Sequence, residues 1–314
     1  MLSMSAAFRS SDLRAHPRRV DLAALPARDR AVLRLLYRME AATARQLTNL
    51  AYRRVRKGQY RLQQLWRLRL TERTAAATDH AGAPPYAHRL TYHVRQRLGY
   101  RTHRPQLSSR LRHLLDSHDV VCALTQPIPD APDGPMQAWL TAPMAGRILG
   151  SAIEPDGVVI LQLKTLSAVL CIELDEGTEH HPVIIDKLER YAAQLRDRGG
   201  WHLLFVVPGR DRLARVRRLA QRPGLAMRGH AWVTLLADVR KRGLNADAYP
   251  AWSVDGPVAL ANLIDDQRDR SSAAPVASDA WLGMLATGGV EDFDRILAGT
   301  ASLAVSALEQ GHTG

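Results

Sequence analysis

Two apolar runs in the middle of the chain set the strongest limit on its fold. Residues 158–163 are almost wholly apolar, and a second run alternates through residues 168–175. A short continuous apolar run is typical of a buried strand, and alternation is typical of a strand with two distinct faces. Because only a few residues, among them Lys164 and Thr165, separate the runs, we predict a β-hairpin.

Acidic residues gather at one end of this hairpin. Asp156 directly precedes the first predicted strand, and Glu173 and Asp175 close the second. Side chains two residues apart on a strand point to the same face, so we expect Glu173 and Asp175 to lie side by side. Clustered carboxylate oxygens are the donors that hard divalent cations prefer. The sequence therefore predicts a site for Mg²⁺ or Mn²⁺ made by Asp156, Glu173 and Asp175.

A helix is predicted to follow the second strand, from about Pro182 to Arg198. Proline suits a first helical turn, and the pair Gly199-Gly200 ends the pattern. Apolar residues recur at the helical period and define one buried stripe. Lys187 borders that stripe, so its ammonium group either reaches solvent or points toward the carboxylates of the sheet.

The surrounding sequence predicts an α/β domain with a mixed sheet over residues 105–250. Apolar strands at 201–207 and 231–236 flank a basic amphipathic helix at 210–221, and this order favours parallel pairing. A helix begins near residue 111, whereas residues 139–150 fit either a helix or an irregular segment. The nearby His113 and His118 are single histidines of a kind that is usually structural or exposed.

At these residues the chain resembles two known groups of proteins. Pro155-Asp156 followed by Glu173-x-Asp175 resembles the core of the PD-(D/E)xK nucleases. The chain from about residue 25 to 240 resembles the replication-relaxation family, on the basis of Asp156-Gly157, the stretch Glu173-Leu174-Asp175-Glu176-Gly177-Thr178, and the downstream Lys187 and Tyr191.

This resemblance implies a winged helix followed by a nuclease-like domain with a catalytic set of Asp156, Glu173 and Lys187. Asp156 and Glu173 would hold the divalent ion, which supplies an activated water, and Lys187 would orient that water. Asp175 stands where the nuclease motif has its lysine, so the resemblance passes that role to Lys187. An upstream glutamate, usual on the first helix of such nucleases, is absent from residues 139–143.

The charge of the chain is distributed unevenly. Residues 1–104 contain 22 Lys and Arg against 6 Asp and Glu, a net charge of +16, whereas the whole chain has +12. The remaining residues are therefore net acidic, at −4. A strong positive charge confined to one region favours a polyanionic partner for that region, and we expect double-stranded DNA.

The basic region has the pattern of a winged helix-turn-helix over residues 25–104. Three short helices are predicted at about 27–39, 43–51 and 56–69, with Thr43 capping the second. The third helix carries the apolar residues Tyr60, Leu62, Leu65, Trp66 and Leu68. Strands at 71–77 and 86–92 around a turn then form the wing, and a short helix follows.

The third helix and its approach carry the residues that we expect to contact DNA. Arginine and glutamine pair with guanine and adenine edges in the major groove, and flanking basic residues hold phosphates. This set comprises Arg53, Arg54, Arg56, Lys57, Gln59, Arg61, Gln63, Gln64 and Arg67. The alternative interpretation is a solvated basic face.

The remaining regions are a flexible basic arm (residues 1–24) and a partly helical C-terminal appendage (residues 251–314). Cys122 and Cys171 are too few for a metal-binding tetrad, and no apolar run is long enough to span a membrane, so we expect a cytoplasmic, nucleoid-associated protein. Self-association or other mobile-element proteins are further candidate partners.

Three functions stay open at this point. The first is a DNA-binding protein of a plasmid or mobile element that acts in replication, relaxation or transfer and has a nuclease-like domain. The second is an active metal-dependent endonuclease or nickase. The third is a winged-helix transcriptional regulator with a degenerate nuclease fold, in which the carboxylates cap a loop and Lys187 forms a structural salt bridge.

Overall fold

The computed structural model describes residues 20–52, 55–75, 86–98, 110–126, 136–142, 145, 153–163, 166–195, 201–222, 224–225 and 230–265. The chain divides into two compact units, and the boundary between them falls between Arg112 and His113. This boundary lies inside helix α5 (Leu111–Leu124), a few residues later than the sequence predicted. We call the described residues up to Arg112 unit 1 and those from His113 to Asp265 unit 2.

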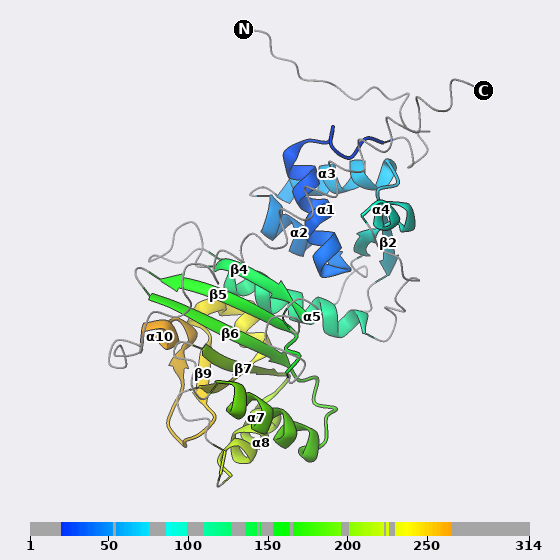
Figure 1. Ribbon diagram of the computed structural model, residues 1–314. Helices are drawn as coiled ribbons and strands as arrows, with labels where there is room; N and C mark the ends of the chain where they lie inside the picture. Colours follow the sequence, from blue (N-terminus) through cyan, green and yellow to red (C-terminus); the bar gives the residue numbers. More distant parts are fainter. Residues whose placement is uncertain are drawn as a thin grey trace, which may run out of the picture. The chain divides into compact units, whose positions relative to one another are not determined.

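Unit 1 combines helices with a small antiparallel sheet (Figure 1). The order is α1 (Ala27–Met39), β1 (Ala42–Thr43), α2 (Ala44–Ala51), α3 (Val55–Arg67), β2 (Thr71–Ala75), β3 (Tyr86–Leu90) and α4 (Tyr92–Arg97). The strands lie in the order β1-β3-β2. The predicted helices and the two later strands are present, whereas the two-residue strand β1 was not predicted.

Local sequence explains how α2 and α3 are held. Thr43 caps α2 as predicted, in a capping box with Gln46: the Thr43 hydroxyl accepts a bond from the Gln46 backbone N–H at 3.2 Å, and the Gln46 side chain accepts from the Thr43 N–H at 2.9 Å. Gly58 lets α3 approach α2, because a Cβ at that position would lie 2.7 Å from Thr48 Oγ1. The buried side chain of Leu22 shows that packing already begins inside the predicted arm.

The turn from α3 into β2 is tightly hydrogen-bonded. The Leu70 N–H donates to the Leu65 carbonyl at 3.0 Å, and the Arg69 N–H donates to the Trp66 carbonyl at 2.9 Å. This pattern is the Schellman motif, in which the residue after the helix adopts a left-handed conformation. Here that residue is Arg69, with φ of 55°, where glycine is usual.

Unit 2 is built on a seven-stranded mixed sheet in the order β10-β9-β8-β7-β6-β5-β4. After α5 its elements are β4 (Met136–Thr141), β5 (Gly157–Leu163), β6 (Leu166–Leu174), α7 (His181–Leu195), β7 (Trp201–Val207), α8 (Arg210–Ala220), β8 (Ala231–Leu235), α9 (Leu236–Arg242), a 3₁₀ turn (Gly243–Asn245), β9 (Asp247–Pro250), β10 (Val258–Ala259) and α10 (Leu260–Asp265). Among the described strands of this sheet, the β6–β7 and β7–β8 pairs are parallel and the others are antiparallel.

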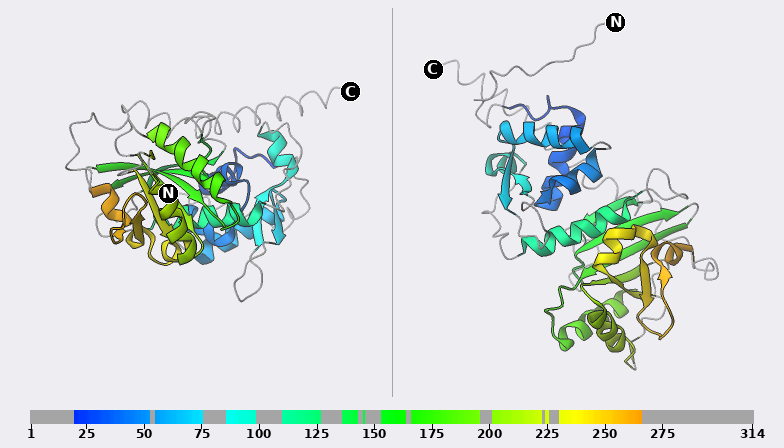
Figure 2. Two further views of the ribbon diagram at one scale, coloured as in Figure 1. Left: turned by 90° about the horizontal axis from the view of Figure 1, so that it is seen from below. Right: turned by 180° about the vertical axis from the view of Figure 1, so that it is seen from behind.

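Helices cover both faces of this sheet. Residues of α7 and α8 share one buried cluster with one face of the strands, and α5 and α9 lie against the opposite face (Figures 1 and 2). Residues of opposite parity on β6, such as Val169 and Leu170, are therefore both buried. This explains why the apolar runs that form the hairpin are nearly continuous.

Two predictions about unit 2 differ from the structure. Residues 139–141 belong to strand β4, so the helix that leads into the sheet is α5 and not the region 139–143, where the sequence has no glutamate. Strand β10 and helix α10 also extend the α/β unit beyond the predicted boundary at residue 250. Residues 266–314 of the predicted appendage lie outside the described part of the chain.

Candidate functional site

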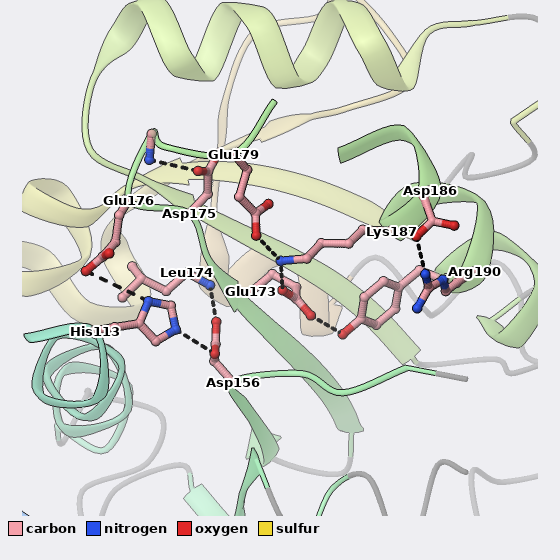
Figure 3. A network of polar contacts seen from close by, with 12 residues as sticks. His113, Asp156, Glu173, Leu174, Asp175, Glu176, Glu179, Asp186, Lys187 and Arg190 are labelled. Atoms are coloured by element: carbon pink, nitrogen blue, oxygen red, sulfur yellow. Dashed lines mark hydrogen bonds and ion pairs between the residues drawn. The ribbon is translucent and has the colours of Figure 1, made fainter. Parts of the chain in front are cut away.

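Glu173 and Lys187 meet between the sheet and α7 (Figure 3). Glu173 is at the end of β6 on the face that α7 covers, and Lys187 and Tyr191 are one turn apart on α7. The Lys187 ammonium donates to Glu173 Oε2 at 3.0 Å, and the Tyr191 hydroxyl donates to Glu173 Oε1 at 2.6 Å. The positions of Glu173 on β6 and Lys187 on α7 thus bring together an acid and an amine that are fourteen residues apart in the sequence.

Burial dominates the electrostatics of this group. Only 3% of Glu173 is exposed, and burial, together with the neighbouring Asp156, raises the pKa of its carboxyl to about 7 although Lys187 opposes the shift. Burial by itself would lower the pKa of the Lys187 ammonium. The carboxylates of Glu173 and Glu179 have the larger combined effect, and the pKa is therefore raised. Burial also raises the pKa of the Tyr191 hydroxyl, which therefore stays a hydrogen-bond donor.

Asp156 joins the same centre from the start of β5. Its Oδ2 accepts a hydrogen bond from the Leu174 backbone N–H at 2.8 Å, which ties the acid to the end of β6. Its Oδ1 lies 2.7 Å from Nε2 of His113 on α5. The hydrogen bond to Asp156 raises the pKa of His113, despite an opposing effect of burial.

His113 is the residue of this centre that sequence reasoning missed. The sequence predicts a single structural or exposed histidine here, because its partner lies 43 residues away and nothing in the local pattern connects the two residues. Its other ring nitrogen, Nδ1, lies 3.9 Å from a carboxylate oxygen of Glu176. The helix that leads into the sheet therefore places an imidazole, and not a glutamate, beside Asp156.

Asp175 has a different environment from the one predicted. It lies on the same side of the sheet as Glu173, as expected, but it pairs with Arg212 of α8. Arg212 Nη2 donates to Asp175 Oδ1 at 3.0 Å, and the Gly177 N–H donates to the same oxygen at 2.8 Å. Only 1% of Asp175 is exposed. Because Arg212 donates to both of its oxygens, this acid is a buried ion-pair partner of α8 in this structure.

The donor set that remains for a divalent ion is Asp156 and Glu173, with Glu179 close by. Lys187 also donates to Glu179 Oε1 at 2.7 Å, while Glu179 Oε2 is a buried atom that has no hydrogen-bond partner among the residues described. Among the described residues, no three His, Cys, Asp or Glu side chains already converge as a metal site. Hard carboxylate oxygens and an unsatisfied buried oxygen nevertheless fit Mg²⁺ or Mn²⁺, because each carboxylate oxygen has a second lone pair.

The predicted DNA-contacting residues occupy the exposed side of α3 in unit 1. Arg56, Lys57, Gln59 and Arg67 are exposed, and Gln63 and Gln64 are partly exposed. Arg61 has another role, because its guanidinium donates to the buried Asp29 of α1, with Nε 3.1 Å from Oδ1. Arg53 and Arg54 lie outside the described residues.

Two aromatic residues of α3 lie outside the core. Tyr60 is 58% exposed and Trp66 is 43% exposed. The core side of α3 is instead formed by Gly58, Leu62 and Leu65. Tyr60 lies four residues after Arg56 and seven before Arg67, so helical geometry places it in the middle of the basic and amide stripe.

The replication-relaxation family model matches residues 33–202, which is more than half of the chain. The chain belongs to the replication-relaxation family. No curated protein and no solved structure matches it. The matched region of this replication-relaxation protein includes Asp156, Glu173, Lys187 and Tyr191, whereas Arg212 lies beyond it.

Family membership indicates a role in the replication or relaxation of plasmid or mobile-element DNA. Within the described residues of this replication-relaxation protein, no helix is both long enough and apolar enough to cross a membrane.

Proposed function

We propose that this protein binds duplex DNA of a plasmid or other mobile element through unit 1, as a winged helix. Unit 2 then provides a nuclease-like centre that takes up Mg²⁺ or Mn²⁺. The observation that carries the proposal is the convergence of Asp156, Glu173 and Lys187, from three separate elements, in a replication-relaxation protein whose N-terminal region is strongly basic.

The DNA-binding part of the proposal draws on the order of elements in unit 1. A winged helix-turn-helix consists of three helices, a short strand between the first two, and a final antiparallel strand pair, and unit 1 has these elements in this order. The exposed stripe of arginine and glutamine on α3 has the side chains that contact base edges and phosphates in the major groove. The excess positive charge in the same region supplies the electrostatic attraction to DNA.

At the centre of unit 2, Asp156 and Glu173 would hold the divalent ion. A bound ion of this kind supplies a nucleophile from water near neutral pH and compensates charge on a phosphate. Lys187 holds its ammonium against Glu173, where it would stabilise negative charge on a bound phosphodiester. Tyr191 keeps the Glu173 carboxylate in position and stays protonated.

One observation favours a second function, a DNA-binding regulator with an inactive nuclease fold. Each carboxylate oxygen of Asp156 and Glu173 already has a hydrogen-bond partner within unit 2. A centre that is saturated in this way would act as a structural network. The two functions differ in whether divalent ions bind and whether DNA is cut.

Titration of Mn²⁺ into the protein by calorimetry, and nicking of supercoiled plasmid with Mg²⁺ or Mn²⁺, separate these functions. We expect Asp156→Asn and Glu173→Gln to abolish both signals. Asp186→Asn is the matched control. Asp186 is an exposed acid of α7 next to Lys187, and among the residues drawn in Figure 3 it pairs only with Arg190. Metal binding or nicking that persists in both site variants would place the chemistry elsewhere.

DNA binding has its own test. The affinity for a labelled duplex should fall steeply with salt concentration, because phosphate contacts release counterions. A salt-independent curve, or no binding, would contradict the role of unit 1 without affecting the metal experiment.

A further inference from the structure

We infer that Trp66 and Arg73 form a clamp for a backbone phosphate of duplex DNA, beside the helix that enters the groove. This inference rests on the DNA binding proposed above and goes beyond the set of residues predicted from α3. The Arg73 guanidinium carbon lies 4.6 Å from the centroid of the Trp66 ring. Trp66 comes from the end of α3 and Arg73 from β2, so the pair connects the helix to the wing.

Trp66 is exposed at a place where core packing does not require an indole. Leu62 and Leu65 already fill the buried side of α3. Trp66 lies three residues after Gln63 and next to Arg67, so it borders the polar stripe of the helix. A large apolar ring exposed beside a basic stripe is typical of an interaction surface more than of a fold-stabilising position.

Arg73 has the properties of a phosphate ligand. Its side chain is exposed and forms no ion pair with any acid among the described residues, and its neighbour Glu72 pairs with Arg89 instead. His88 of β3 is buried and lies opposite Arg73. Burial and the charge of Arg73 lower the pKa of the His88 imidazole to about 4, so the ring is neutral near neutral pH. Within the part of the chain that the structure describes, no acid therefore neutralises the positive charge of Arg73.

The contact with the Trp66 ring prepares the Arg73 guanidinium for this role. A guanidinium that lies flat on an aromatic face keeps the N–H groups at its edge available for bidentate bonds to phosphate. The ring also limits the rotamers of the arginine, so less entropy is lost when a phosphate binds. The Schellman turn through Arg69 and Leu70 fixes β2 relative to α3, and so fixes the distance between the clamp and the stripe.

The phosphodiester backbone of duplex DNA is the occupant to which this geometry points. Apart from Val55, Tyr60 and Trp66 itself, the exposed side chains of α3 are basic or amide, and residues 1–104 have a net charge of +16. An acidic protein partner would also meet a cationic surface, but it lacks the regularly spaced phosphates whose condensed counterions are released when DNA binds.

The test is a salt series with a short fluorescein-labelled duplex and the full-length chain. We expect Arg73→Ala to reduce the salt slope by about one phosphate contact and to weaken binding about three- to tenfold. Trp66→Leu should weaken binding about two- to fivefold because it removes the π face, whereas Trp66→Phe, which keeps a ring, should retain most of the affinity. In the Arg73→Ala background, Trp66→Leu should add nothing.

The outcomes are distinguishable. A wild-type protein that does not bind the duplex contradicts the proposed function itself. A wild-type protein with a steep salt slope that Arg73→Ala leaves unchanged refutes only the clamp. An equal loss from Trp66→Leu with and without Arg73 shows that the indole contacts DNA directly and refutes its positioning role. Far-UV circular dichroism checks that the variants fold, as expected for substitutions of two exposed residues.

Discussion

The ion pair between Asp175 and Arg212 gives the sharpest test of how unit 2 is held together. Only 1% of Asp175 and 8% of Arg212 are exposed, and Arg212 also donates to the Glu179 carbonyl at 2.8 Å. Arg212→Met leaves the carboxylate buried with the Gly177 N–H as its remaining donor among those described. Removal of one partner from a buried pair costs about 3–5 kcal/mol, so we expect a loss of this size in the free energy of unfolding.

Urea denaturation followed by circular dichroism measures this loss. Arg215→Met is the matched control, because Arg215 is an exposed arginine one turn along α8, and its removal should change stability by no more than about 0.5 kcal/mol. The double variant Asp175→Asn with Arg212→Met should recover much of the loss, since no buried charge remains. An Arg212→Met cost below about 1 kcal/mol, as for an exposed pair, would refute the reasoning. In that case Asp175 would return as a candidate metal ligand.

Three further substitutions test other features of the fold. The folded-state pKa of Glu173 of about 7 exceeds its ordinary 4.5, so the folded protein binds more protons between these values and its unfolding free energy should fall as pH rises across them. Glu173→Gln should lack this decline in parallel urea titrations. Arg69→Gly should raise the unfolding free energy by about 1 kcal/mol because glycine adopts the left-handed conformation freely, and Arg69→Ala should give no such gain. Gly58→Ala should lower the unfolding free energy by about 1–3 kcal/mol because its Cβ would crowd Thr48. A combined Thr48→Ala should restore part of the loss. A gain in stability from Gly58→Ala alone would contradict the close approach of α2 and α3.

Local periodicity was enough to predict most elements and the acidic cluster at one end of the hairpin. The predicted bounds of α1 agree with the structure, and β5, α7 and β7 begin within one residue of the predicted positions. These elements have either a clear helical stripe or a nearly continuous apolar run, which are strong local signals. Strand β4 was missed because the short segment around Trp139 has neither signal and is recognised only by its pairing with β5.

Partners that are distant in sequence account for the remaining differences. The contact of His113 with Asp156 and that of Arg212 with Asp175 depend on how helices α5 and α8 pack on the sheet, and no spacing along the chain encodes it. The same limit applies to α3, where Tyr60 and Trp66 are apolar enough for a core position. Their exposure is decided by neighbouring elements, because Leu62 and Leu65 already occupy the available interior space.

The glycine that follows Asp156 bears on how relatives of this chain should be compared. A methyl group at Gly157 would lie 3.3 Å from Nε1 of Trp139, so the space beside the acid is filled by an indole from the edge strand. Selection for a stable sheet would therefore keep a small residue here even in a descendant that had lost all activity. An Asp-Gly pair in a diverged relative is consequently a marker of this packing arrangement, and evidence for chemistry has to come from the acid and the lysine themselves.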